Sequence, residues 1–116
     1  MIKRLRAKLG RSIEDLDDER VQKLVADLGV TPIAEAPART RVVLAGEVQG
    51  LQVVTRGGSF SLEVTVGDGS GRAIAVFTGR RRLPGMDPGR RVILEGVGRR
   101  ERGRLLVVNP AYTLVE

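Results

Sequence analysis

The chain has 116 residues, a formal net charge of +6 at pH 7 and a sequence pI near 11.0, and it contains neither cysteine nor histidine. This length fits one domain with a modest core, and the missing residue types exclude disulfides, thiol nucleophiles, Cys/His zinc sites and imidazole acid–base chemistry. The arginine excess favours a polyanionic partner, either nucleic acid or an anionic membrane surface. A codon bias toward arginine, glycine, alanine and valine explains the same composition equally well.

The first third of the chain is predicted to be helical. Apolar residues recur at helical spacing among basic residues in 2–9, and Ser12 begins a capping-box-like start to a second helix. The prolines in 31–38 prevent a helix from continuing there. We therefore predict an N-terminal helical extension over residues 1–35 and a separate domain over residues 36–116.

No segment of the sequence indicates a membrane or export signal. No apolar stretch approaches the ~20 residues needed to cross a bilayer, and the N-terminus lacks the apolar core of a signal peptide. We expect a cytoplasmic protein without a transmembrane segment.

From Thr40 onward the apolar residues alternate with period two, which predicts β-strands. In the second predicted strand, alternate residues from Phe60 to Val66 face the core. Gly46 and Gly50 allow the first strand the sharp bend that a small barrel needs. The five predicted strands cover about residues 40–54, 60–66, 72–78, 91–98 and 104–112.

The connections between these strands predict the fold. Asp68-Gly69 is a strong hairpin signal between two apolar runs. The longer connector after the third strand contains Pro84, Gly85, Pro88 and Gly89, so it has room for at most one helical turn. Five short strands with this connector match the OB-fold. The predicted fold is an all-β, five-stranded Greek-key OB-fold barrel preceded by a short N-terminal helical segment.

Several turn motifs over about residues 39–115 resemble a known family, the OB-fold wedge domain of RecG-type branched-DNA helicases. The matching motifs are Asp68-Gly69-Ser70-Gly71, Val76-Phe77, Pro88-Gly89-Arg90-Arg91-Val92 with Gly96, and Asn109-Pro110-Ala111-Tyr112. These motifs mostly encode turns, so they are more specific for the fold than for a ligand. The resemblance implies a module that binds nucleic acid.

The whole chain is similar to a family of small actinobacterial OB-fold nucleic-acid-binding proteins. The shared features are the acidic two-helix leader, the linker Thr31-Pro32-Ile33-Ala34-Glu35 and the run Gly79-Arg80-Arg81-Arg82. This chain has Phe77-Thr78 where that family is expected to have Trp-Leu.

Phe77 has two interpretations. If it stands on the outer face of the third strand with Ala73 and Ala75, its ring is a platform on which a base stacks. If the strand is turned the other way, Phe77 belongs to the core.

The arginines come from segments that flank the binding face of an OB-fold. The first loop, the hairpin between the last two strands and the run after the third strand should converge on Phe77 and bind phosphates. Some of these side chains can equally be solvated hairpin tips, and the outward Glu63 either repels phosphate or pairs with an arginine. The predicted nucleic-acid-binding residues are Arg56, Arg72, Phe77, Arg80, Arg81, Arg82, Arg99, Arg100, Arg102 and Arg104.

Catalysis is not expected. The glycine-rich segment 67–71 joins two strands, so no helix N-terminus is present to hold a phosphate. No serine has a histidine partner, and the carboxylates form no metal-ligand pattern. We predict a non-enzymatic protein without cofactor or metal that binds single-stranded or branched DNA, or RNA. The alternatives are a protein-interaction module and attachment of the basic N-terminal helix to an anionic membrane.

Overall fold

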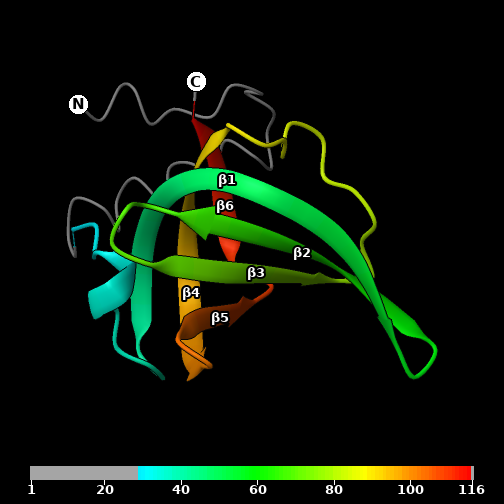
Figure 1. The fold of residues 1–116 in the computed structure, drawn as a ribbon, viewed down its shortest axis with the longest axis horizontal. Helices are drawn as coiled ribbons and strands as arrows, with labels where there is room; N and C mark the ends of the chain where they lie inside the picture. The colour runs from blue at the N-terminus through cyan, green and yellow to red at the C-terminus, as the bar shows by residue number, and fades with distance from the viewer. Residues whose placement is uncertain (1–28, 116) are drawn as a thin grey trace.

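A six-stranded β-sheet rolled into a ring forms the described part of the computed structural model, residues 29–115 (Figure 1). The sheet order is β1-β2-β3-β5-β4-β6, and β1 also pairs with β4, which closes the ring. The all-β prediction is confirmed, and the ring is OB-like in its strand order. Both predicted N-terminal helices lie outside the described residues. The elements are the 3₁₀ helix η2 (Ile33–Glu35), β1 (Arg41–Arg56), β2 (Ser59–Gly67), β3 (Arg72–Thr78), β4 (Arg91–Glu101), β5 (Arg104–Val108) and β6 (Ala111–Val115).

The predicted final strand is wrong in one respect: residues 104–112 contain two strands instead of one. The chain turns between β5 and β6 because Pro110 has no N–H for a ladder and Asn109 has a φ of 50°. After this turn the pairing of the chain changes: β5 runs parallel to β3, whereas β6 runs antiparallel to β4. The predicted absence of a long helix between β3 and β4 is confirmed.

Strand β1 changes partners at its middle. Residues 41–47 pair with β4, residues 47–56 pair with β2, and a bulge lies between Val48 and Gly50. A Cβ added to Gly46 would lie 2.7 Å from the carbonyl oxygen of Gly67, whereas one added to Gly50 would meet nothing within 4 Å. The predicted need for glycine is therefore confirmed at Gly46, and the bulge accounts for the bend near Gly50.

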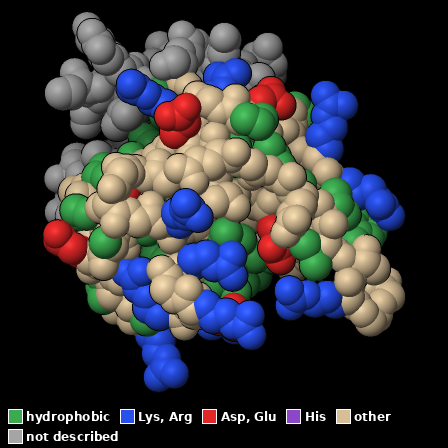
Figure 2. All heavy atoms as spheres, in the orientation of Figure 1, with side chains coloured by type: hydrophobic (Ala, Val, Ile, Leu, Met, Phe, Trp, Pro, Cys, Tyr) green, Lys and Arg blue, Asp and Glu red, His purple; other side chains and the backbone are tan. Residues whose placement is uncertain are grey.

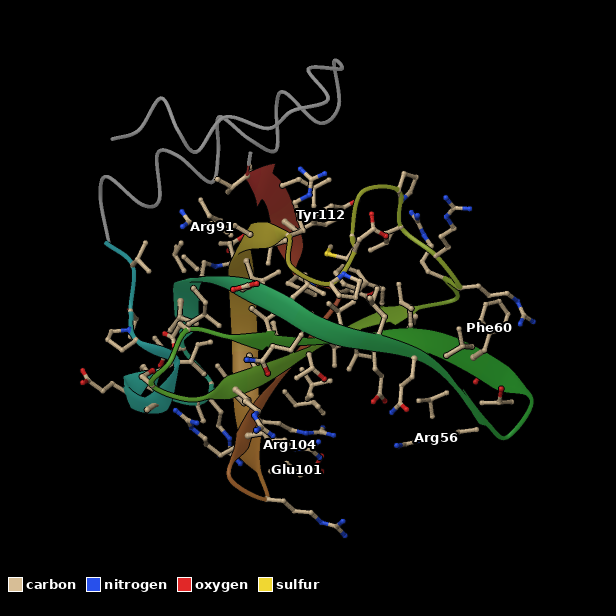
Figure 3. All side chains as sticks on the ribbon, turned by 45° about the horizontal axis from the view of Figure 1, so that its top comes forward. Arg56, Phe60, Arg91, Glu101, Arg104 and Tyr112 are labelled. Carbon is tan, nitrogen blue, oxygen red and sulfur yellow. The ribbon has the colours of Figure 1, made fainter. Side chains whose placement is uncertain are left out.

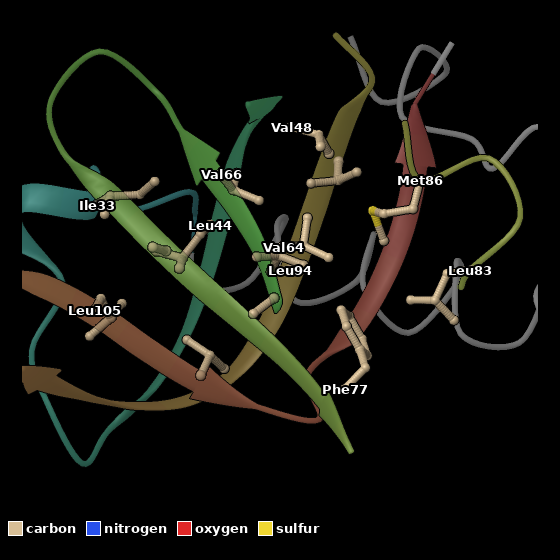
Figure 4. Close-up of a cluster of buried hydrophobic side chains, with 14 of the residues drawn as sticks. Ile33, Leu44, Val48, Val64, Val66, Phe77, Leu83, Met86, Leu94 and Leu105 are labelled. Carbon is tan, nitrogen blue, oxygen red and sulfur yellow. The ribbon is translucent and has the colours of Figure 1, made fainter. Parts of the chain in front are cut away.

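The ring encloses one hydrophobic core (Figure 4). Leu62, Val64 and Val66 of β2 point inward as predicted, and Leu83 and Met86 of the connector cover one end of the barrel. A second, smaller apolar cluster lies on the opposite face of the sheet formed by β1, β4 and β6. Its buried residues are Val43, Ile93 and Val115.

The predicted linker is packed into the barrel. Ile33 is completely buried, and its N–H donates to Asp68 Oδ2 at 2.9 Å. On the other side, Arg100 donates to the carbonyl oxygens of Ile33 and Ala36 at 2.7 and 3.0 Å. The turn at Asp68 and the end of strand β4, far apart in the chain, therefore hold η2 against the barrel. The division into a helical extension and a barrel stays a prediction, since residues 1–28 are not described.

Asp68 also organises its own turn. Its Oδ1 accepts hydrogen bonds from the N–H and hydroxyl of Ser70 and from the N–H of Gly71, at 2.7 to 3.2 Å. Burial raises the pKa of Asp68, but the bonds from Ser70, Ile33 and Gly71 outweigh this effect and leave the pKa below its ordinary value. The turn prediction for 67–71 is confirmed.

We expect the Gly46→Ala substitution to lower the free energy of unfolding by about 1–3 kcal/mol, because the new methyl group meets backbone that cannot move aside. Gly50→Ala is the matched control and should be neutral or stabilising by up to about 1 kcal/mol. Denaturant unfolding of both variants measures the difference, and equal losses would contradict the assigned point of close approach.

The stability of the fold should also depend on the ionisation of Asp68. Because its folded pKa is depressed, the stabilisation is fully present above the ordinary aspartate pKa of about 4 and is lost as the pH falls through the folded value. Unfolding free energies measured below pH 5 should therefore decrease less steeply in Asp68→Asn than in the wild type. Parallel pH profiles would show that this carboxylate is not the titrating group.

Candidate nucleic-acid interface

A groove of about 300 Å³ crosses the outer face of β2, β3 and β5. The β1–β2 hairpin bounds it on one side and the β4–β5 hairpin on the other. Figure 3 shows Arg56, Glu101 and Arg104 on this side of the ribbon and Arg91 on the opposite side. The groove is lined by Val54, Arg56, Ser59, Ser61, Glu63, Ile74, Val76, Thr78, Arg99, Glu101, Arg104, Leu106 and Val108.

The floor of the groove is aliphatic. Successive side chains of a strand point to opposite faces, so Ile74 and Val76 face the groove while the small neighbours of β3 face the core. The parallel register places Ile74 beside Leu106 and Val76 beside Val108. Val108 is 50% exposed, so the floor offers apolar surface to a ligand.

The walls of the groove carry charges of both signs. A guanidinium nitrogen of Arg56 lies 4.0 Å from Glu63 Oε2, and one of Arg99 lies 3.8 Å from Glu101 Oε2. Arg104 has no ion-pair partner among residues 29–115. Exposed ion pairs of this kind are worth about 0–1 kcal/mol, so a phosphate can replace the carboxylate at little cost. Figure 2 shows basic side chains gathered over the lower half of this face.

The structure brings together some of the predicted arginines and separates others. Arg56, Arg99 and Arg104 line the groove, and Arg72 begins β3 on the groove face, one residue before the register pair Ala73–Leu105. Arg100 faces the other way and binds the carbonyls at η2. The remaining four are all exposed: Arg102 at the tip of the β4–β5 hairpin, and Arg80, Arg81 and Arg82 on the connector.

The prediction of Phe77 as a stacking platform is corrected by the structure. Phe77 is 6% exposed, and its ring packs edge-on against Tyr112 with the centroids 5.6 Å apart. Ala73 and Ala75 face inward, and Phe77 on the same side of β3 enters the core with them. Phe77 therefore contributes to stability and is not part of the groove.

The assignment of Phe60 to the core is also wrong. The β1–β2 hairpin extends beyond the barrel, so Phe60 is only half-buried, and the guanidinium carbon of Arg81 lies 4.1 Å from its ring centroid. The pair forms a cation–π contact on the face of the hairpin opposite the groove.

The apolar residues of the groove floor were not among the predicted site residues: Ile74, Val76, Leu106 and Val108. They alternate with other apolar residues, so periodicity alone did not tell which side of the strand faces outward. Side-chain size distinguishes the two faces of β3, because alanine occupies two of its inner positions, 73 and 75.

Within the described part of the chain, no group of three or more His, Cys, Asp or Glu residues is arranged to hold a metal ion. A search of the same residues finds no helix long and apolar enough to span a membrane.

Comparison with known proteins supports the fold. No protein-family model matches the chain, and no curated protein matches it in sequence, so both family resemblances stay predictions. Among solved structures, the chain is similar to the solution NMR structure of the replication factor A related protein from Methanobacterium thermoautotrophicum. The TM-score is 0.52 at 13% sequence identity, and the match covers 75% of this chain and 91% of the other. A likeness at this identity shows the fold alone.

The two neighbouring arginines of β4 should differ in what they support. Arg100→Ala removes two charge-assisted hydrogen bonds to η2 and should cost about 1–3 kcal/mol of stability. Arg99→Ala removes only a loose surface ion pair and should change stability by less than about 0.5 kcal/mol. Thermal or denaturant unfolding distinguishes them, and a larger loss in Arg99→Ala would contradict the assigned roles.

Proposed function

We propose that this protein binds single-stranded nucleic acid in the groove, with little sequence selectivity and without catalysing a reaction. The observation that carries the proposal is the arrangement of arginines on both walls of an aliphatic floor. The similarity to a replication factor A related protein supports a fold on which such a groove occurs.

The arginines supply affinity that does not depend on sequence. Arg56 stands on one wall and Arg99 and Arg104 on the other, so a backbone that lies along the groove meets cations on both sides. Each neutralised phosphate releases condensed counterions, and affinity therefore falls as salt rises. Because phosphates look the same at every nucleotide, these contacts carry no sequence information.

The floor favours unpaired bases. Val76, Leu106 and Val108 offer apolar surface to the flat faces of bases, which a duplex keeps stacked inside the helix. Single strands, or the single-stranded arms of branched DNA, fit this surface best. Because both DNA and RNA present these groups, the proposal includes both.

A protein-interaction module is the second candidate, and one observation favours it. The groove floor contains no aromatic side chain and its lining includes Glu63 and Glu101, whereas single-strand binders commonly stack bases on aromatic rings. An extended peptide with apolar side chains would also match this floor.

The absence of catalysis is part of the proposal. Each acidic side chain of the groove lies within 4.0 Å of an arginine.

The salt dependence of binding tests the proposed function. Replacing Arg99 and Arg104 together by glutamine should weaken binding to a deoxythymidine oligonucleotide and flatten the plot of log affinity against log salt by about 1.4, at roughly 0.7 per phosphate contact on a single strand. Replacing Arg90 and Arg91, which lie outside the groove, by glutamine removes the same charge and should leave the slope nearly unchanged.

Fluorescence anisotropy over a salt series measures both slopes. Equal slopes in the two double variants would remove the groove from the binding site. If the wild type binds neither DNA nor RNA at low salt, the protein-interaction module becomes the better account.

A further inference from the structure

One aromatic ring, that of Phe60, lies outside both the core cluster and the groove. All three aromatic residues are within the described part of the chain. Phe77 is buried, and Tyr112 packs against the core with its ring against Phe77. Phe60 is partly buried on the β1–β2 hairpin, lies outside the core cluster and has Arg81 over its ring. Phe60 is therefore the aromatic side chain best placed to stack with a base outside the core.

The hairpin directs Phe60 and Arg56 to opposite faces. Phe60 pairs with Thr55 and Ser59 pairs with Arg56 in the β1–β2 register, so consecutive rows of the ladder point to opposite sides. Arg56 lines the groove, whereas Phe60 shares its side of β2 with Leu62. Figure 3 shows the two labelled side chains at the same end of this hairpin.

A second hollow, of about 310 Å³, lies on the Phe60 side of the hairpin, between β1 and the connector. Leu51, Leu62, Leu83 and Met86 line its apolar part, and Arg81 and Arg82 stand at its edge. Val53, which also lines it, is 44% exposed. The hollow is therefore open, mixed in polarity and edged by cations, and its volume reaches the lower end of the range for small-molecule sites.

The chemistry of this hollow suits a nucleobase. Arg81 lines the hollow, and its flat guanidinium lies over the ring of Phe60, which is not itself a lining residue. Bases stack on both aromatic rings and arginine planes. Gln52 and Asp87 line the same hollow and supply hydrogen-bonding groups for a base edge. Arg82 at the edge provides a cation for the attached phosphate.

We propose that the hollow beside Phe60 and Arg81 is a base-binding subsite, which takes one unpaired base from the strand that occupies the groove. This inference rests on the proposed function. Within the described residues, no strand pairs with the outer edge of residues 50–56 of β1, so a nucleic-acid strand can pass around this edge from Arg56 to Phe60. The subsite provides the stacking that the aliphatic floor lacks.

Paired variants and paired probes test the subsite in the full chain. Phe60→Leu keeps an apolar side chain but removes the ring, and Phe60→Tyr keeps the ring. The probes are a deoxythymidine oligonucleotide and an abasic oligonucleotide with the same backbone. We expect Phe60→Leu to bind the first probe about tenfold more weakly with an unchanged salt slope, and the abasic probe as the wild type does. Phe60→Tyr should bind the deoxythymidine oligonucleotide as tightly as the wild type does.

The outcomes separate the subsite from the groove. If the wild type binds the deoxythymidine oligonucleotide and Phe60→Leu binds it equally well, the subsite is wrong and the proposed function stands. If the wild type binds neither probe, the proposed function fails. In that case, an NMR titration tests the hollow independently of the groove. Millimolar adenosine 5′-monophosphate should shift the Phe60 ring and Met86 methyl signals, and inorganic phosphate should not. Unshifted signals would overturn the subsite.

Discussion

The ring closes because β1 pairs with two strands in succession, and this requires the chain to bend where the backbone of Gly46 approaches Gly67. Without the bend, β1 would continue along one partner, and the β1–β4 pairing that closes the ring would be lost. Closure turns one face of β2, β3 and β5 inward to the core and the other outward between two hairpins (Figure 1). The groove is thus a direct consequence of how one strand is shared.

Neighbouring residues that point to opposite faces of a strand have different roles, one in stability and the other in binding. On β4, Arg99 faces the groove, while its neighbour Arg100 holds the carbonyl groups of η2. On the β1–β2 hairpin, Arg56 faces the groove, and Phe60 lies on the other face with Arg81 over its ring. A cluster of arginines in the sequence therefore contains members with different roles, and the direction of each side chain decides which role it has. The proposed interface needs only those that face the groove or the hollow.

The sequence predicts a strand's facing only where its two sides differ in polarity. Strand β2 alternates apolar and polar residues, so its inward side was identified from Leu62 onward, whereas β3 is apolar on both sides and left Phe77 undecided. Tertiary partners far apart in the chain were also beyond prediction. Arg100 donates a hydrogen bond to the carbonyl oxygen of Ile33, 67 residues away in the sequence, and no local pattern predicts that contact. Phe60 was misplaced because periodicity does not show where a hairpin extends past the barrel.

The central claim is that single-stranded nucleic acid occupies the groove, and mapping of backbone amide shifts by NMR tests it most directly. On titration with a deoxythymidine oligonucleotide, the account predicts shifts that concentrate on the groove strands, at Glu63, Ile74, Val76 and Leu106. The second apolar cluster, at Val43 and Ile93 on the opposite side of the barrel, should stay unchanged. Shifts confined to that cluster, or a spectrum that does not change at low salt, would contradict the account.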